Sequence, residues 1–152
     1  MTTRVGSLDE LPPLVGTHLG YSDYRLVTQE DVDLFARATG DHQWIHVDPE
    51  RAARESPFGG PIAHGYLTLS LAPVLLREVY GVSGVSVGVN YGCNRVRFPA
   101  PVPVGSRLRL GARLQSVEEI PGGAQVVLVL SFEVEGQAKP SCVAETVYRF
   151  YL

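Results

Sequence analysis

The segment from Gly65 to Tyr80 constrains the fold more than any other part of the sequence. Its apolar residues fall on all sides of a helical wheel, and Gly81 ends the pattern. A helix that is apolar all round is normally covered by the rest of the chain, so we expect a buried central helix. The segment is shorter than the roughly 20 residues that a bilayer requires and holds Pro73 near its middle, so no membrane span is expected. The pattern consists of Leu67, Leu69, Leu71, Val74, Leu75, Leu76 and Val79.

Four segments after this helix are rich in β-branched and aromatic residues, which favour strands. Between the second and the third, Pro121-Gly-Gly123 predicts a hairpin turn. Consecutive antiparallel strands that follow short helices and one buried helix are typical of an α+β domain. We therefore expect a curved antiparallel sheet wrapped around the central helix. The expected strands are Val85 to Phe98, Arg107 to Val117, Gln125 to Glu135 and Cys142 to Tyr151.

Two short helices are expected before the central one. Thr28 offers a hydroxyl cap to the first, acidic residues follow in its first turn, and Gly40 can adopt the left-handed conformation that ends a helix. Asp48-Pro49-Glu50 carries the same kind of start signal for the second helix, with Pro at its first position. The connection between them, residues 41–46, is expected to be non-helical.

Length and charge limit the number of domains and the partners. A chain of 152 residues suits one domain with its own core, so we take residues 1–152 as a single domain with an extended lead-in at residues 1–14. The net charge of −3 comes from scattered residues without a dense Lys or Arg cluster. Nucleic acid is therefore not an expected partner.

Cysteine usage and the N-terminus bear on the compartment. Cys93 and Cys142 fit neither a disulfide framework nor the spacing of zinc ligands, and we expect both to be small core residues in a reducing compartment. The lead-in holds acidic residues and prolines where a signal peptide needs an unbroken apolar stretch. We expect a cytoplasmic protein that does not associate with a membrane.

Asp41 and His46 are the strongest candidates for chemistry. They are five residues apart across a connection outside the predicted helices, so a carboxylate and an imidazole could share one water molecule, which suits acid-base catalysis. The alternative is that Asp41 caps the turn after Gly40 and that His46 is a half-buried, hydrogen-bonded structural residue. His42 and His46 have the spacing of metal ligands on a helix, but they lie on a predicted loop, so no metal is expected.

Ala63-His64-Gly65 stands at the start of the predicted central helix, where backbone N–H groups lack partners inside the helix. Gly65 has no side chain to block a carbonyl group, so its amide could stabilise an oxygen that becomes negatively charged. The alternative is a glycine that a tight turn requires.

These residues resemble a known family. Phe35-Ala-Arg-Ala-Thr-Gly-Asp-His-Gln-Trp-Ile-His46-Val-Asp-Pro49, followed by Pro61-Ile-Ala-His-Gly65, is similar to the hydratase motif of the MaoC-like (R)-specific enoyl-CoA hydratases, which have the hot-dog fold. The match is best to the subgroup similar to nodulation protein N. It runs from about Leu19 to the C-terminus and includes Val96-Arg-Phe-Pro-Ala-Pro-Val-Pro-Val-Gly105.

The resemblance implies a function and a site. Asp41 and His46 would take the catalytic roles, and the Gly65 amide would polarise the thioester carbonyl. The reaction would be reversible addition of water to trans-2-enoyl thioesters, carried by CoA or acyl-carrier protein, without cofactor or metal. A homodimer that joins two sheets is implied as well.

Three further residues are expected at the substrate. His64 precedes the glycine of the motif, and Trp44 replaces a proline found in many members, so it either walls the acyl pocket or packs beneath the loop. Arg97 could meet the phosphates of CoA, or it could simply face solvent. Two other functions stay open: a hot-dog thioesterase, in which the water attacks the thioester carbon, and a non-catalytic acyl-thioester-binding subunit.

Overall fold

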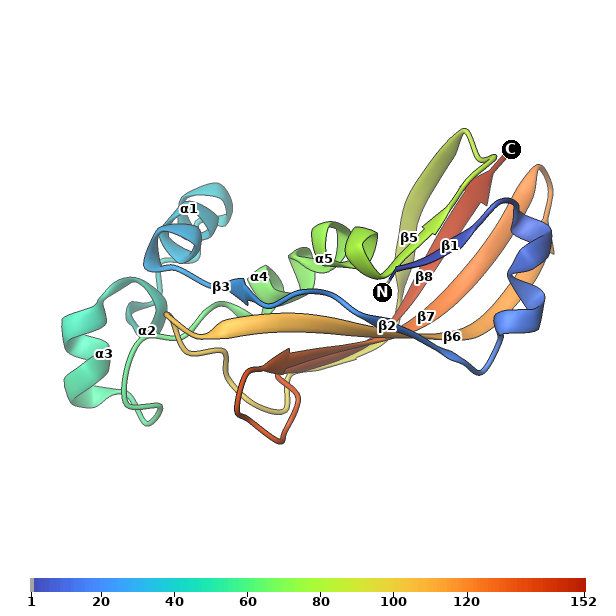
Figure 1. The fold of residues 1–152 in the computed structure, drawn as a ribbon. Helices are drawn as coiled ribbons and strands as arrows, with labels where there is room; N and C mark the ends of the chain where they lie inside the picture. Colours follow the sequence, from blue (N-terminus) through green and yellow to red (C-terminus); the bar gives the residue numbers. More distant parts are fainter. Residues whose placement is uncertain (1) are drawn as a thin grey trace.

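An antiparallel sheet is the main layer of the computed structural model, which describes residues 2–152 (Figure 1). Its strand order is β2-β6-β7-β8-β5, and the two-residue strand β3 also pairs with β6. The four expected strands are therefore confirmed, with small differences at their ends. The strands of this sheet are β2 (His18–Tyr21), β3 (Arg25–Leu26), β5 (Val87–Arg97), β6 (Arg107–Ile120), β7 (Gly123–Val134) and β8 (Cys142–Tyr151).

The predicted hairpin between β6 and β7 is confirmed. Pro121 and Gly122 form its loop, and Gly122 has a φ of 80°, which only glycine adopts without strain. From this turn the two strands stay paired as far as Leu108 and Val134. On β7 every second residue is buried, from Ala124 to Val134, so one face of the sheet is continuously apolar.

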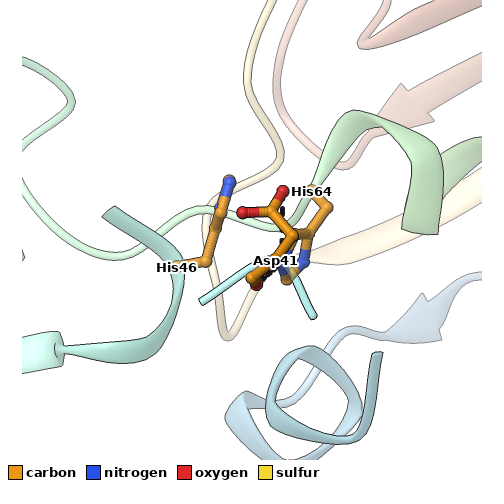
Figure 2. Close-up of side chains that lie close together, drawn as sticks. All are labelled: Asp41, His46 and His64. Atoms are coloured by element: carbon orange, nitrogen blue, oxygen red, sulfur yellow. Dashed lines mark hydrogen bonds and ion pairs between the residues drawn. The ribbon is translucent and has the colours of Figure 1, made fainter. Parts of the chain in front are cut away.

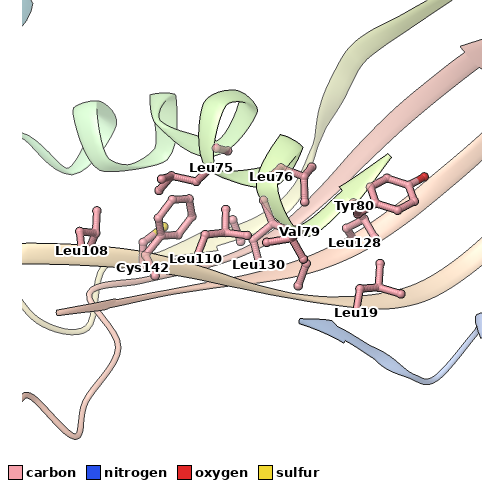
Figure 3. Packing of buried hydrophobic residues seen from close by; sticks show 14 of the residues in the cluster. Leu19, Leu75, Leu76, Val79, Tyr80, Leu108, Leu110, Leu128, Leu130 and Cys142 are labelled. Atoms are coloured by element: carbon pink, nitrogen blue, oxygen red, sulfur yellow. The ribbon is translucent and has the colours of Figure 1, made fainter. Parts of the chain in front are cut away.

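The central helix packs on this apolar face but is divided in two: α4 (Gly65–Ser70) and α5 (Ala72–Val79) (Figures 1 and 3). The expectation of one unbroken helix is wrong. Pro73 lies in the first turn of α5, and because proline lacks an N–H and collides with the preceding turn, the first helix ends before it. No helix within residues 2–152 is long and apolar enough to cross a membrane.

One side of this helix pair is buried and the other is not. Leu75 and Val79 lie fully buried over Leu110 and Leu130 of the sheet (Figure 3). In contrast, Tyr66 and Val74 are 71% and 41% exposed. Complete coverage of the helix, as the all-round apolar pattern predicted, is therefore wrong for the isolated chain, because the sheet reaches only one side of it.

The N-terminal region contains elements that the sequence did not predict. The strand β1 (Thr3–Val5) pairs in parallel with β4 (Tyr80–Val82), and two turns of 3-10 helix, η1 (Leu8–Glu10) and η2 (Pro12–Leu14), follow it. The lead-in is thus extended only in its first part. Leu11, between the two turns, is fully buried and ties this region to the core.

The two early helices are confirmed as α1 (Gln29–Thr39) and α3 (Pro49–Glu55). Thr28 and Asp31 form a complete capping box, and Asp48 caps α3 through a hydrogen bond of 3.1 Å from the Arg51 N–H. Residues 41–46 are not entirely irregular, because a single helical turn, α2 (Trp44–Val47), forms there. Cys142 is buried as expected, whereas Cys93 is exposed on β5, so its predicted core position is wrong.

Candidate active site

Asp41, His46 and His64 meet at one place although they come from three elements (Figure 2). Asp41 stands in the turn after α1, which Gly40 ends with a φ of 82°. His46 lies in α2, and His64 is the N-terminal cap residue of α4. One potential ligand atom from each of the three side chains lies within 4.8 Å of the others. The site therefore joins the connection after α1 to the start of the central helix.

Asp41 both caps a turn and faces the histidines. Its Oδ1 accepts a hydrogen bond of 3.3 Å from the Gln43 N–H, as the structural alternative predicted. Its Oδ2 lies 4.0 Å from His64 Nε2, and the side chain is 53% exposed. The carboxylate can therefore reach a water molecule or a substrate while one of its oxygens holds the turn.

His46 is buried and its hydrogen positions are constrained. Its Nδ1 lies 2.7 Å from the carbonyl oxygen of Ile62, and since a carbonyl only accepts, Nδ1 carries the ring hydrogen. Burial is the main cause that lowers the pKa of His46 below its ordinary 6.5. The Ile62 hydrogen bond and the Asp41 charge act in the opposite direction, while His64 adds to the lowering. The neutral ring thus presents a lone pair on Nε2.

His64 is more deeply buried than His46, with 3% of its surface exposed. The two imidazole rings stack with centroids 3.9 Å apart and an interplanar angle of 26°. The Nε2 atom of His64 lies 3.0 Å from the backbone oxygen of Asp41. Each ring thus has one nitrogen in a hydrogen bond to a backbone carbonyl. The lone pairs of two stacked rings lie in roughly parallel planes, so they do not point at one metal ion about 2 Å from each nitrogen. This geometry suits proton transfer better than metal binding.

Gly65 opens the helix beside an apolar cavity of about 240 Å³. Its N–H finds no backbone acceptor within residues 2–152, as is usual in the first turn of a helix. A β-carbon at this position would lie 3.1 Å from the Phe98 ring, so a side chain would crowd the cavity wall. The glycine therefore keeps the amide accessible. The cavity is lined by Phe58, Ile62, Ala63, Gly65, Thr68, Phe98, Pro99, Ala100, Pro101, Val102 and Ser141.

The structure does not bring Trp44 and Arg97 to this cluster. The Trp44 ring is covered by the Arg51 guanidinium, 4.3 Å from its centroid, and it does not line the cavity beside Gly65. Arg97 is exposed on β5, where it lines a separate groove of about 270 Å³ together with Arg95. Both expected roles in substrate binding remain predictions.

Sequence reasoning missed two contributors to the site. The first is the backbone carbonyl of Ile62, which sets the tautomer of His46 and has no side-chain signature. The second is Phe98, which comes from a different part of the chain and whose ring packs against Gly65 at the edge of the cavity. Its position after β5, within the Val96 to Gly105 stretch of the motif, was the one available signal.

A curved antiparallel sheet packed on a central helix is the hot-dog architecture, and a carboxylate and an imidazole near the N-terminus of that helix are groups that a hydratase would need. Known proteins similar to this chain point to the same class. The family model of the MaoC like domain matches residues 10–134 of the chain. The chain is 54% identical over 145 residues to 3-hydroxyacyl-thioester dehydratase Z of Mycobacterium tuberculosis, covering 95% of both chains. It therefore belongs to the MaoC-like dehydratase family.

One further relative supports the same family, and one solved structure supports the fold. Nodulation protein N of Rhizobium leguminosarum bv. viciae is 44% identical over 144 residues, which cover 93% of this chain and 89% of the relative. The fold resembles that of unliganded R-hydratase PhaJ1 from Pseudomonas aeruginosa, with a TM-score of 0.72 and 24% identity. The match covers 90% of this chain and 81% of the hydratase. The predicted family, fold class and enzyme class, a hydro-lyase, are confirmed.

Proposed function

We propose that the chain adds water reversibly to trans-2-enoyl thioesters and removes it from (R)-3-hydroxyacyl thioesters. One observation carries the proposal: the Asp41 carboxylate, the Nε2 lone pair of a neutral His46 and the unpaired Gly65 amide belong to one corner of the fold. The reaction needs a proton acceptor, a proton donor and a group that stabilises an enolate, and these residues supply all three. Neither a metal nor an organic cofactor is required.

The Gly65 amide acts on the thioester oxygen. As water adds to C3 of the enoyl group, the electrons of the double bond move towards the carbonyl, and the thioester oxygen gains negative charge. A backbone N–H without another partner can donate to that oxygen, and the adjoining cavity offers space for the thioester beside it.

Asp41 and His46 together transfer a single proton during the reaction. A neutral His46 holds the attacking water as an acceptor and cannot supply a proton at the outset, while Asp41 acts as the general base. Asp41 removes one proton from the water and passes it to His46 Nε2, and the protonated imidazole then delivers that proton to the α-carbon. The negative charge of Asp41 favours the protonated imidazole that exists in between. Dehydration follows the same steps in reverse.

His64, Trp44 and Arg97 were each expected to contact the substrate. Arg95 and Arg97 are exposed and line one groove, which Glu145 also lines, and their guanidinium groups can bind the phosphates of CoA or of an acyl-carrier protein arm. Trp44 is proposed as a wall of the acyl pocket, with its ring held in place by Arg51. His64 is buried beside Asp41 and His46.

We also propose a homodimer formed through β5. This strand ends the sheet, so one row of its backbone groups is unpaired, and Val87, Val89 and Tyr91 on it are exposed. Pairing with the same strand of a second copy would satisfy these groups. Light scattering should give about twice the chain mass of 16.5 kDa. A parent protein that stays monomeric would refute the dimer.

Residues 1–152 are taken as one domain in a cytoplasmic protein. The single-domain proposal is supported by one hydrophobic core that extends from Val5 through the central helix to Ala144. Two unpaired cysteines are compatible with a reducing compartment.

The test is to incubate the purified protein with trans-2-enoyl-CoAs of graded chain length and follow loss of the conjugated enoyl absorbance. We expect loss of absorbance without release of free thiol. A dehydrogenase specific for (S)-3-hydroxyacyl-CoA should fail to consume the product. Release of thiol would instead identify a thioesterase, and tight acyl-CoA binding without turnover would identify a binding subunit; either would overturn the proposal.

A further inference from the structure

His64 is the buried member of the cluster that the mechanism above does not use. Its ring lies between two others: His46 at a centroid distance of 3.9 Å and Phe35 of α1 at 4.9 Å. It contributes one hydrogen bond, from Nε2 to the backbone oxygen of Asp41, across 23 residues of chain. His64 thus contacts the backbone of one catalytic residue and the ring of the other.

The remaining nitrogen of His64 limits what this residue can do. Nδ1 is buried and has no hydrogen-bond partner among the described residues. A hydrogen on Nδ1 would find no acceptor there, so the ring hydrogen belongs on Nε2, where the Asp41 carbonyl accepts it. Neither nitrogen is therefore free to meet a substrate.

The Asp41 turn has few other anchors. The Asp41 N–H donates to Thr39 Oγ1 at 3.3 Å, and Asp41 Oδ1 accepts from the Gln43 N–H at 3.3 Å. Both bonds are long and both lie inside the exposed turn, so the turn is joined to His46 only weakly, through Gln43, whose carbonyl accepts from the His46 N–H. The bond of 3.0 Å from His64 is the contact that ties the turn to the start of the central helix.

We propose that His64 is a positioning residue that holds the Asp41 turn by its Nε2–H and the His46 ring by stacking, so that the two catalytic side chains keep their mutual distance and angle. This inference rests on the proposed function. It replaces the expected substrate contact of His64 with an action through Asp41 and His46. Loss of His64 should therefore reduce kcat and leave KM close to the parent value.

Two variants separate the two contacts. His64→Phe keeps an aromatic ring for the stack and removes the donor, whereas His64→Gln keeps a donor at a similar reach and removes the ring. We expect His64→Phe to lower kcat by roughly tenfold to a hundredfold, the scale for a catalytic group displaced by about 1 Å. His64→Gln should retain clearly more of the parent kcat. His42→Gln is the matched control, because His42 is exposed and lies in the same turn, and it should keep the parent kcat.

A second measurement detects the contact between His64 and His46 without turnover. The titratable groups that face His46 are His64 and Asp41, and His64 lowers the pKa of the His46 ring. Its removal in His64→Gln should shift the His46 titration, followed by ring nitrogen NMR, to higher pH, and His42→Gln should not. A purely structural change elsewhere would not move this titration.

The outcomes are distinct. Parent kcat in His64→Phe would overturn the inference, and so would a raised KM at unchanged kcat, since that indicates substrate contact. An unchanged His46 titration in His64→Gln would overturn the proposed action of His64 on the His46 ring. Asp41→Asn in the same assay separates the two levels: if it is inactive while His64→Phe is fully active, only the inference fails, whereas an active Asp41→Asn refutes the proposed function itself.

Discussion

The sheet core and the segment between Gly40 and Gly65 are built in different ways. In the core, alternate residues of β6 and β7 face the central helix, and many apolar contacts share the stabilisation. In the other segment the important contacts are few and polar: Ile62 to His46, His64 to Asp41, and one ring stack. The difference suggests that stability and chemistry can be changed separately. The predictions below test that separation, from the largest expected effect on turnover to the smallest.

Asp41→Asn and His46→Ala should give the largest losses. The first keeps the shape and the hydrogen bond to Gln43 while it removes the base, and the second removes its partner. Each should lower kcat by about two to four orders of magnitude, the range for lost acid-base catalysis. Melting temperatures should stay close to the parent value. Near-normal turnover of short and long enoyl-CoAs in both variants would refute the assignment.

Gly65→Ala should have the next largest effect. The added methyl group would lie 3.1 Å from Phe98 and would crowd the cavity beside the amide. We expect kcat/KM to fall by roughly tenfold to a hundredfold, as expected for a displaced reacting group. Gly60→Ala is the matched control, because a β-carbon there meets no atom within 4 Å. Equal losses of kcat/KM in the two variants would show that Gly65 has no special role in catalysis.

Trp44→Ala should change selectivity more than rate. If the ring walls the acyl pocket, the ratio of kcat/KM for long over short enoyl-CoAs should rise by roughly tenfold or more, the scale of one to a few methylenes. Trp44→Phe should fall between the parent and the alanine variant. A uniform loss at all chain lengths, together with a large fall in melting temperature, would show that Trp44 packs beneath the loop instead.

The pH profile should be displaced to the acidic side. Burial lowers the pKa of His46 below 6.5, and the proposed mechanism uses the neutral ring, which is lost as pH falls through that lowered value. The acidic limb of kcat/KM should therefore lie below 6.5, and activity should be retained between that limb and neutral pH. A limb centred above 6.5 would contradict the neutral resting state of His46.

Leu128→Ala should leave turnover unchanged and lower stability. Leu128 is fully buried on β7, and the cavity left by a Leu→Ala change costs about 2 to 5 kcal/mol of unfolding free energy. Chemical denaturation measures the loss, and kcat per folded molecule should stay within about twofold, since distant sites act independently. A loss of kcat comparable to that of Gly65→Ala would show that core and site are coupled.

Sequence patterns predicted the regular parts of this molecule well. The caps at Thr28, Gly40 and Asp48 are local signals, and they placed α1 and α3 correctly. The division of the central helix was visible in Pro73, although its consequence was underestimated. The short strands β1 to β4 were missed because two to four residues are too few to establish alternation.

The site was predictable only as a list of residues. The motif named Asp41, His46, His64 and Gly65, and the structure places them together. The contact between His64 and the Asp41 backbone spans 23 residues, and the tautomer of His46 depends on a carbonyl, so neither follows from residue types. Cys93 is exposed because β5 is the last strand of the sheet, and this strand order does not follow from residue types either.

The most direct test of the central claim, that Asp41 and His46 pass one proton as a pair, is a double-mutant cycle. The kcat/KM of the parent, Asp41→Asn, His46→Ala and the double variant is measured on one enoyl-CoA from the loss of enoyl absorbance. Groups that act as a unit are strongly non-additive, so the double variant should be about as active as the worse single variant. Losses that multiply in the double variant would show two independent contributions and would contradict the shared proton.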